Sequence, residues 1–479
     1  MQDISKSLKA LLVYLSQEDA DYLISGKLEY GMKRVPKLGF MYLASVLKKK
    51  DIDTVIKDQS LKTFTLGMLL DELQKENYLF VGFYSATALK QKLIHYIKEI
   101  KKTIPHIPIL VGGPGFYSAK DYLDAGGDIV CKGEGEKTIL EIVEYLYKKR
   151  PIASVKGISY KFDSRILDTP PQALIENLDE LPFPRRKKDK SLTDYYDFHI
   201  FNMRTPYTTM ITSRGCPYVC TYCTSTNVWG NRIRLRSPEN VIGEIAYCVE
   251  ELGIRYIGFR DDLFGFNYEW LNDFCNLLIE KRYNVLWSCM VHPFSFRKGR
   301  KETLRLLKKA SCDLLIFGLQ SAHPQILKNI RRNPSEPEEL SKTIKLAKSL
   351  GISTVAEFIF GLPAETSETI NTSINYVLRI KPHYTQFNAL SVLEGSQIER
   401  DFLNKDICQF SDDEIRKLCS YASRKFYGNP LVLLQDLIHI LRKNPLWFFR
   451  IARYFLYLFK YLGFYKYRYS TKKEKYESS

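Results

Sequence analysis

Residues 212–223 read Thr-Ser-Arg-Gly-Cys-Pro-Tyr-Val-Cys-Thr-Tyr-Cys, which places Cys216, Cys220 and Cys223 in one short loop. Thiolates are soft ligands that suit iron–sulfur clusters or zinc, and a loop with a glycine and a proline can turn its three sulfurs towards one point. Three cysteines leave one iron of a four-iron cluster open to a small molecule. We therefore interpret the loop as a 4Fe-4S site with an open iron.

Zinc and disulfides are the alternatives for these cysteines. A structural zinc ion takes four ligands, and the next cysteine, Cys248, lies 25 residues further on in a helical pattern. Disulfides belong to oxidising compartments, and the chain begins Met-Gln-Asp-Ile-Ser-Lys, without a signal-peptide pattern. Zinc is therefore the main alternative to the cluster. The remaining cysteines stand singly in apolar segments and are expected to be packing residues: Cys131, Cys248, Cys275, Cys289, Cys312, Cys408 and Cys419.

The composition bounds the protein class. The 479 residues, 45% hydrophobic and 26% charged, are enough for two or three domains. The net charge is +17, but the lysines are spread along every segment, so we expect no nucleic-acid partner. No uncharged apolar run approaches the ~18 residues of a membrane span, which favours a cytoplasmic protein that does not cross a bilayer.

Residues 1–150 alternate continuous apolar runs with helix-like periodic segments. This pattern predicts a Rossmann-like, doubly wound parallel sheet with five strands, at Lys9–Leu15, Thr54–Asp58, Tyr78–Ser85, Pro108–Gly112 and Asp128–Lys132. Ligands of such sheets bind at the carboxyl ends of the strands. Glycines let the backbone approach a ligand there, and hydroxyls can donate hydrogen bonds. The candidate binding residues are Ser85, Thr87, Gly112, Gly113, Gly133, Glu134 and Gly135.

Residues 151–207 mix prolines with the charge run Arg186–Lys190 and are interpreted as an exposed linker. Residues 208–400 contain six strand-like segments separated by amphipathic helical stretches, which predicts a partial (β/α)6 barrel of the TIM type. Its functional groups are expected at the carboxyl ends of the strands, and the cysteine loop follows the first of them. The strand-like segments are Thr208–Thr212, Arg255–Asp262, Val285–Val291, Asp313–Ser321, Thr354–Leu362 and Tyr384–Val392.

Residues 401–479 are expected to form a helical carboxyl-terminal region. Pro445–Leu462 is almost wholly apolar and aromatic, and Arg450, Arg453 and Lys460 share one narrow helical face. Such a helix must bury its apolar surface. It packs on the barrel as a lid, the favoured interpretation, or lies in a membrane interface. The polar end, Thr471–Ser479, is expected to be disordered.

Two parts of the chain resemble known modules. The Cys-x3-Cys-x2-Cys loop resembles that of the radical S-adenosylmethionine (SAM) enzymes, in which the SAM amino and carboxylate groups chelate the fourth iron and an electron from the cluster cleaves SAM to a 5′-deoxyadenosyl radical. Pro36–Ala44, followed by Val111–Pro114 and Gly133–Glu136, is similar to the cobalamin-binding domain that precedes many radical SAM modules. Residues 178–184, Leu-Asp-Glu-Leu-Pro-Phe-Pro, match the segment between those modules.

The resemblance implies SAM contacts at three strand ends. Asp261 and Asp262 stand where related enzymes hold the SAM amino group, although Asp262 alternatively caps the next helix. Gln320 and Ser321 belong to a Gly-x-Gln-Ser pattern, which some family members carry where many have Gly-x-Glu-Ser. Gln320 can hydrogen-bond ribose or carboxylate but cannot act as a base.

Two further residues are implied on the adenine side. Gly361 belongs to a Gly-Leu-Pro-x-Glu-Thr turn that borders adenine in the family, while Glu365 of the same turn alternatively completes a helix start. Tyr222 resembles the aromatic residue whose backbone faces adenine; the alternative is an ordinary loop aromatic. No catalytic side chain is assigned.

The cobalamin resemblance has one departure. The general cobalamin fold often carries Asp-x-His-x-x-Gly, whose histidine binds cobalt from below, but the first histidine of this chain is His95. The resemblance therefore implies a cobalamin whose lower face lacks an imidazole. A generic Rossmann-like domain for another nucleotide remains the alternative.

The family resemblance implies a cobalamin-dependent methyltransferase acting on an unactivated carbon of a small or lipid-like substrate, under anaerobic conditions. An electron donor such as flavodoxin or ferredoxin would reduce the cluster. The runner-up is a radical cyclase or rearrangement enzyme resembling the anaerobic magnesium-protoporphyrin ester cyclase. A cobalamin- or SAM-binding regulator without catalysis is the third hypothesis. Peripheral membrane contact would come from the tail.

Overall fold

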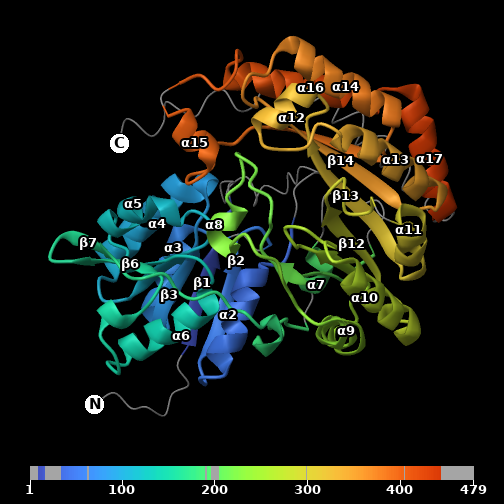
Figure 1. Cartoon of the computed structure of the whole chain (residues 1–479). Helices are drawn as coiled ribbons and strands as arrows, with labels where there is room; N and C mark the ends of the chain where they lie inside the picture. The colour runs from blue at the N-terminus through green and yellow to red at the C-terminus, as the bar shows by residue number, and fades with distance from the viewer. Residues whose placement is uncertain are drawn as a thin grey trace.

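The computed structural model describes residues 9–16, 34–61, 64–188, 191–195, 204–297, 299–403 and 405–443. Figure 1 shows two large sheets, each with its own helices, and the short helix α8 (Ser225–Trp229) lies between them. The chain is therefore a two-sheet α/β protein with a helical carboxyl-terminal region.

The first sheet has the strand order β2-β1-β3-β4-β5-β6-β7. The first five strands in this order are parallel, as their continuous apolar sequences predict, and each begins and ends within two residues of the predicted bounds. They are β1 Lys9–Tyr14, β2 Asp53–Asp58, β3 Tyr78–Tyr84, β4 Ile109–Gly112 and β5 Ile129–Cys131.

Helices cover both faces of this sheet. One face packs its even-numbered β1 residues, such as Leu12, on α2 and α6, and the other packs Leu11 and Val13 on α3, α4 and α5. This alternation follows from the two-residue period of a strand, and it gives the doubly wound fold that the sequence predicts. The helices are α2 Leu38–Lys48, α3 Leu66–Lys75, α4 Lys90–Thr103, α5 Ala119–Asp124 and α6 Gly135–Leu146.

The first sheet is longer than the five strands predicted. β6 (Ile158–Phe162) and β7 (Arg165–Asp168) form a hairpin that pairs antiparallel with β5. Its turn residues, Asp163 and Ser164, both have positive φ, and polar residues can adopt this conformation. The hairpin comes from the segment interpreted as linker, so the sheet continues past residue 150.

The prediction that the charge run after residue 185 is exposed is wrong for its first member. Arg186 is buried, because its guanidinium pairs with the Glu244 carboxylate at 2.6 Å and donates to the Thr209 carbonyl at 2.8 Å. An arginine remains charged at any ordinary pH, so burial requires such partners. Arg186 therefore fastens the connecting segment to the second sheet.

The second sheet is fully parallel, with the order β15-β14-β13-β12-β11-β8. It forms the six-stranded partial barrel that the spacing of apolar segments predicts. A separate two-stranded antiparallel sheet is formed by β9 (Ser213–Arg214) and β10 (Arg234–Leu235). The barrel strands are β8 Tyr207–Met210, β11 Tyr256–Phe259, β12 Leu286–Val291, β13 Cys312–Gln320, β14 Ser353–Phe360 and β15 Tyr384–Ala389.

The barrel helices pack outside the sheet, where Phe259, Phe274 and Trp287 form part of one large core (Figure 1). Further helices are α7 Ser191–Asp194, α9 Pro238–Ala246, α10 Tyr268–Lys281, α11 Arg300–Lys309, α12 Pro324–Asn329, α13 Glu336–Ser349, α14 Ser367–Ile380, α15 Gln397–Asp401, α16 Asp412–Tyr427 and α17 Pro430–Lys443.

Side chains form hydrogen bonds with outward-facing backbone groups on both outer strands of the barrel, β15 and β8. On β15, the Tyr427 hydroxyl accepts from Thr385 N and donates to Thr385 O. On β8, Arg186 binds the Thr209 carbonyl. These contacts replace the neighbouring strand that a closed barrel would supply.

The carboxyl-terminal helix α17 turns its polar side inward. Gln435 accepts from Lys348 Nζ at 2.6 Å, and the His439 ring lies 2.9 Å from the Ser353 hydroxyl. The predicted aromatic helix Pro445–Leu462, with Arg450, Arg453 and Lys460, and the polar end Thr471–Ser479 lie outside the described residues. No helix within the described ranges has the length and apolar character required to cross a membrane.

Candidate active site

The cysteine loop begins where the chain leaves β8, at the carboxyl end of the first barrel strand. Gly215 has φ +95°, and a Cβ there would collide with the Arg232 carbonyl oxygen, so only glycine fits this turn. The turn directs the chain into Cys216, Cys220 and Cys223, which lie at the rim predicted for them.

The three thiols differ in exposure. Cys223 is exposed, Cys216 and Cys220 are half-buried, and burial raises the pKa of Cys216 to about 11. Such thiols become thiolate ligands when a metal supplies positive charge. The described residues contain no group of three His, Cys, Asp or Glu side chains gathered around a single ion. The charges of Cys220 and Cys223 both act on the Cys216 thiol, so the three thiols are neighbours in this loop.

Cys248, the next cysteine in the sequence, is not available as a fourth zinc ligand. Cys248 is fully buried in the barrel core, and burial raises its pKa to about 11. Cys275, Cys289, Cys312 and Cys419 are also buried, as expected of packing residues.

The two aspartates after β11 have different surroundings. Asp261 is buried, and its Oδ1 accepts hydrogen bonds from Thr212 N at 2.8 Å and from the Thr212 and Ser213 hydroxyls, both at 2.7 Å. Asp262 is exposed at the rim, and its charge acts on Cys216 and Cys223. Asp261 thus supports the start of the cysteine loop from beneath, and Asp262 is the carboxylate directed to the rim.

Gln320 and Ser321 also differ in their surroundings, like the two aspartates. Gln320 is half-buried at the end of β13 with φ +70°, and its side chain folds back over Gly318, where a Cβ would lie 2.5 Å from Gln320 Nε2. Ser321 is fully buried and lies 3.4 Å from the Ser373 hydroxyl of α14. Gln320 therefore faces the rim, whereas Ser321 joins β13 to a helix.

Gly361 has φ +91° at the end of β14, and its N–H donates to Glu365 Oε2 at 2.7 Å. Leu362 N donates to the same oxygen at 3.1 Å. Burial raises the pKa of Glu365 to about 7, although these two N–H groups act in the opposite direction. The Glu365 carboxylate therefore holds the turn at Gly361 and Leu362, which lies just before helix α14.

A buried polar network next to the cysteine loop could not be anticipated from sequence. Arg332 donates to the Tyr222 hydroxyl at 3.1 Å and pairs with Glu336, which also contacts His292 at 3.4 Å. The Tyr218 ring stacks on His292 with 4.4 Å between centroids. The aromatic residues of the loop are thus anchored to helix α13, and no motif marks Arg332 or Glu336.

The rim of the first sheet is built mainly from backbone. Gly113 has φ +113°, and a Cβ there would lie 2.7 Å from the Ser85 carbonyl oxygen. Ser85 N donates to Gly112 O at 2.7 Å, and the Ser85 hydroxyl donates to the same oxygen at 3.2 Å. Thr87 begins the 3-10 turn η1 (Thr87–Leu89) and is half-buried. Strand ends of this kind present a narrow glycine surface to a ligand.

Aromatic rings and one ion pair complete this rim. Lys37 Nζ lies 3.7 Å from the Tyr14 ring centroid and 3.7 Å from Asp58 Oδ2, and the Tyr84 ring lies 5.4 Å from that of Tyr14. Burial raises the pKa of Tyr84 to about 12, so the phenol is neutral. His95 is exposed on α4. The described rim residues therefore suit a planar apolar ligand and include no imidazole.

Gly133, Glu134 and Gly135 follow β5 as predicted, but the side chain of Glu134 has protein partners. Its carboxylate pairs with Arg214 at 3.0 Å and with Arg234 at 2.9 Å. Gly133 lies against α8, because a Cβ there would be 3.9 Å from Val228 O. The loop after β5 is thus in contact with the segment that carries the cysteines.

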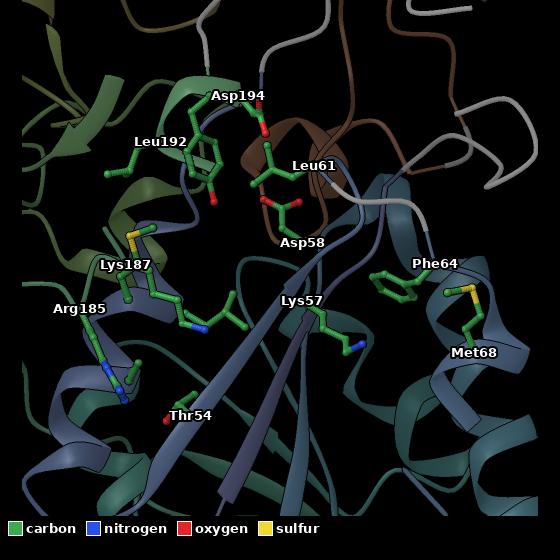
Figure 2. A pocket seen from close by; sticks show the side chains of 14 residues that line it. Thr54, Lys57, Asp58, Leu61, Phe64, Met68, Arg185, Lys187, Leu192 and Asp194 are labelled. Carbon is green, nitrogen blue, oxygen red and sulfur yellow. The ribbon is translucent and has the colours of Figure 1, made fainter. Parts of the chain in front are cut away.

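A cavity of about 610 Å³ lies beside β2, at the edge of the first sheet (Figure 2). Its wall combines apolar side chains such as Phe64 with charged ones, of which Lys57 pairs with Glu72 and Arg185 pairs with Asp53. None of the predicted binding residues lines it, but Asp58 of the first rim does, so the cavity adjoins that rim at the end of β2.

Two family models match this chain. The Radical SAM superfamily model matches residues 210–377, and the B12 binding domain model matches residues 32–143. The first range contains the cysteine loop and four of the six barrel strands in full, β11 to β14, and the second contains β2 to β5 and the glycine rim.

The chain is similar over most of its length to proteins of several organisms. It is 27% identical to an uncharacterised methyltransferase of Pyrococcus horikoshii over 90% of this chain and 95% of that protein. It is 25% identical to an anaerobic magnesium-protoporphyrin IX monomethyl ester cyclase of Rubrivivax gelatinosus, over 70% of this chain and 60% of that one.

A solved structure has the same fold. The radical SAM methyltransferase TsrM of Kitasatospora setae superposes with a TM-score of 0.66 and 18% identity, covering 82% of this chain and 75% of that one. The cysteine loop at the barrel rim and the glycine rim of the first sheet thus accompany both family modules. The chain belongs to the radical SAM enzymes with an amino-terminal cobalamin-binding domain, whose cofactors are a 4Fe-4S cluster, SAM and cobalamin.

Proposed function

We propose that this enzyme is a cobalamin-dependent methyltransferase that acts on an unactivated carbon of a small or lipid-like substrate. The observation that carries the proposal is the contact between the two rims, where the Glu134 carboxylate pairs with Arg214, two residues before Cys216. A methyl donor and a radical generator must both reach one substrate carbon, so their sites have to be neighbours.

The chain's own residues divide the work. Cys216, Cys220 and Cys223 hold the cluster, and Asp262 and Gln320 offer a carboxylate and an amide to SAM beside Gly361, with Tyr222 anchoring the loop. When bound, the cluster and SAM supply a hydrogen-abstracting radical and cobalamin supplies the methyl group. The protein excludes water and aligns these groups with the substrate.

The first domain contributes backbone to cobalamin. Thr87, Gly112, Gly113, Gly133 and Gly135 line the proposed corrin site directly. We assign supporting roles to Ser85, whose hydroxyl binds Gly112 O, and to Glu134, whose carboxylate binds arginines. Asp261 and Ser321 have similar supporting roles in the barrel. The corresponding domain division is 1–150, 151–207, 208–400 and 401–479, with the β6–β7 hairpin extending the first sheet.

Quantifying two products together tests the proposal. The anaerobically reconstituted protein, reduced by dithionite or by flavodoxin or ferredoxin, is expected to cleave SAM. With a substrate, methyl transfer produces both 5′-deoxyadenosine and S-adenosylhomocysteine. Formation of 5′-deoxyadenosine alone would instead support the cyclase or rearrangement alternative, which the similarity to the Rubrivivax gelatinosus cyclase favours. Binding of cofactors without any SAM turnover would support a regulator.

The lower face of cobalt is tested separately. We propose that no histidine nitrogen binds cobalt, because His95 is exposed on α4 and no histidine precedes it. Electron paramagnetic resonance of the Co(II) form is expected to show no nitrogen superhyperfine splitting. Splitting from an axial nitrogen would contradict this assignment.

We propose peripheral membrane contact from helix α17. Leu431, Leu434, Ile438 and Leu441 are exposed by 58%, 54%, 41% and 36%, and they recur at helical spacing on the side opposite the buried Val432. These four apolar residues therefore face outward, and the net charge of +17 favours anionic lipid.

Flotation with anionic vesicles tests the membrane contact. Wild type is expected to float, and a Leu431→Gln/Leu434→Gln/Ile438→Gln variant to remain behind. A matched control, Leu403→Gln, replaces a leucine that is 67% exposed outside α17 and should float like wild type. Failure of wild type to float at low salt would reject the contact and favour a lid formed by the following residues.

A further inference from the structure

Four buried charged side chains join the two rims. We call Glu134, Glu136, Arg214 and Arg234 the interdomain ion cluster. Arg214 pairs with Glu134 at 3.0 Å and with Glu136 at 2.5 Å, and Arg234 pairs with Glu134 at 2.9 Å. None of these side chains is more than 7% exposed. Two cations balance two anions, so the cluster carries no net charge that needs solvent.

The positions of these residues in the chain show which two sites the cluster connects. Glu134 ends the loop after β5 that is proposed to line the corrin, and Glu136 lies in the first turn of α6. Arg214 precedes Cys216 by two residues, and Arg234 lies opposite Arg214 in the β9–β10 pairing. One end of the cluster is therefore part of the proposed cobalamin site, and the other is part of the iron–sulfur loop.

Arg214 has little freedom to move. Its guanidinium lies between two rings, 5.4 Å from the Tyr42 centroid and 4.9 Å from the Trp229 centroid, while its terminal nitrogens bind the carboxylates. Arg234 also donates to the Ile175 carbonyl at 2.6 Å and the Trp229 carbonyl at 2.9 Å. A planar cation with directed hydrogen bonds on several sides accepts only one arrangement of its neighbours.

A buried ion pair adds little to stability compared with apolar packing, but it has a narrow set of allowed geometries. The other interdomain ion pair near the rims, Lys90 with Glu394 at 3.1 Å, is about one-quarter exposed and so is less constraining. Of the ion pairs between the two domains in the described parts of the chain, the interdomain ion cluster is thus the one able to fix the register of the rims.

We propose that the interdomain ion cluster sets the distance and orientation between the proposed corrin site and the iron–sulfur loop, with Arg214 as the positioning residue. The inference rests on both cofactors binding at the sites given under the proposed function, and it does not depend on which reaction follows. Glu136, which no motif assigned to a site, becomes part of this alignment.

Hydrogen–deuterium exchange of the cofactor-free protein is the first test. Glu136→Gln removes one charge while keeping the volume, and Arg214→Lys keeps the charge but cannot bridge two carboxylates. Both variants are expected to exchange faster than wild type in 133–137 and in 213–217 together. Faster exchange in only one of these segments would overturn the positional link.

Pulsed electron paramagnetic resonance of the protein loaded with Co(II) cobalamin and reduced cluster is the second test. Wild type is expected to give one narrow spin–spin distance, and Glu136→Gln a shifted or broader one with unchanged iron and corrinoid content. An unchanged distance in both variants would overturn the inference. Loss of corrinoid alone would also overturn it, because Glu136 would then act on cobalamin directly.

Glu244→Gln is the matched control. Glu244 is a buried carboxylate held by two arginines, Arg186 at 2.6 Å and Arg236 at 2.5 Å, but neither partner belongs to the first sheet or to the cysteine loop. This control is expected to lower the thermal midpoint without changing the exchange of 133–137 or the spin–spin distance. Changes equal to those of Glu136→Gln would show a general loss of stability instead. If wild type binds neither cofactor, the proposed function fails, while the exchange result still decides the link between the loops.

Discussion

The rims of the two sheets prepare their sites by different means. At the first sheet, Gly112 and Gly113 bring backbone groups close together and side chains contribute little. At the barrel, the proposed ligand groups are side chains, the thiols of the cysteine loop and the exposed Asp262. The difference teaches that the first site depends on the shape of the main chain, whereas the second depends on the chemical identity of its residues.

The largest expected effect removes a ligand from the barrel rim. Cys220→Ala is expected to abolish formation of 5′-deoxyadenosine, because a cluster with two protein ligands is not held. Iron and labile sulfide of the anaerobic protein measure the loss. Cys248→Ala is the control, since this buried thiol lies in the core, and it should retain iron. Equal loss of iron in both variants would contradict the assignment.

A methyl group at the glycine rim should have the next largest effect. Gly113→Ala places a Cβ 2.7 Å from Ser85 O at a backbone conformation with φ +113°, which costs about 1–3 kcal/mol. Cobalamin affinity should fall, measured by absorbance titration, while SAM cleavage is retained. Gly39→Ala is the matched control, because a Cβ at Gly39 of α2 meets nothing within 4 Å. A corrinoid affinity unaffected by Gly113→Ala would break the comparison.

Glu365 tests whether the barrel rim also depends on main-chain shape, since its carboxylate holds the Gly361 turn. Its pKa of about 7 in the folded protein lies above the ordinary 4.5, so the folded state retains a proton that the unfolded chain releases between these values. The free energy of unfolding should therefore fall as pH rises from 4.5 to 7, by up to about 3 kcal/mol, and then level off.

Denaturant unfolding of wild type and Glu365→Gln at pH 5 and pH 8 measures this contribution. The amide cannot titrate, so the variant should lose this part of the pH dependence and be relatively more stable at pH 8. An identical pH dependence in the two proteins would show that this carboxyl does not titrate in the range.

The smallest expected effect concerns Ser85. Because its hydroxyl donates to Gly112 O, Ser85→Ala should lower the free energy of unfolding by about 1 kcal/mol and leave corrinoid affinity nearly unchanged. Thr87→Ala, at the half-buried start of η1, should lower corrinoid affinity instead. The reverse order of affinities would assign direct contact to Ser85.

The sequence predicted those features that depend on local pattern. Continuous apolar runs located every parallel strand, because both faces of these strands are buried. The β6–β7 hairpin was missed because its exposed, half-polar residues, such as Arg165 and Asp168, resemble a linker. The spacing alone predicts Cys216, Cys220 and Cys223 as cluster ligands, since they are close in the chain.

The features that the sequence did not predict depend on partners that are distant in the chain. Arg186 looked exposed within a charge run, but Glu244 receives it from 58 residues away. Glu134 and Asp261 were placed correctly at strand ends, yet the direction of each carboxylate depends on residues that the topology brings near, Arg214 and Thr212. Charge and position can be seen in a sequence, whereas the pairing of buried charges requires the fold.

The hydrogen bonds between the Tyr427 hydroxyl of α16 and the outer strand β15 have a consequence for the chain during synthesis. Thr385 emerges from the ribosome 42 residues before Tyr427, and until the tyrosine arrives its backbone N–H and C=O face outward from an unpaired strand. Unpaired strand edges recruit other chains, so this interval is when nascent copies are most exposed to aggregation. A chain truncated between Thr385 and Tyr427 should therefore be insoluble, whereas a chain that ends after α16 should be soluble.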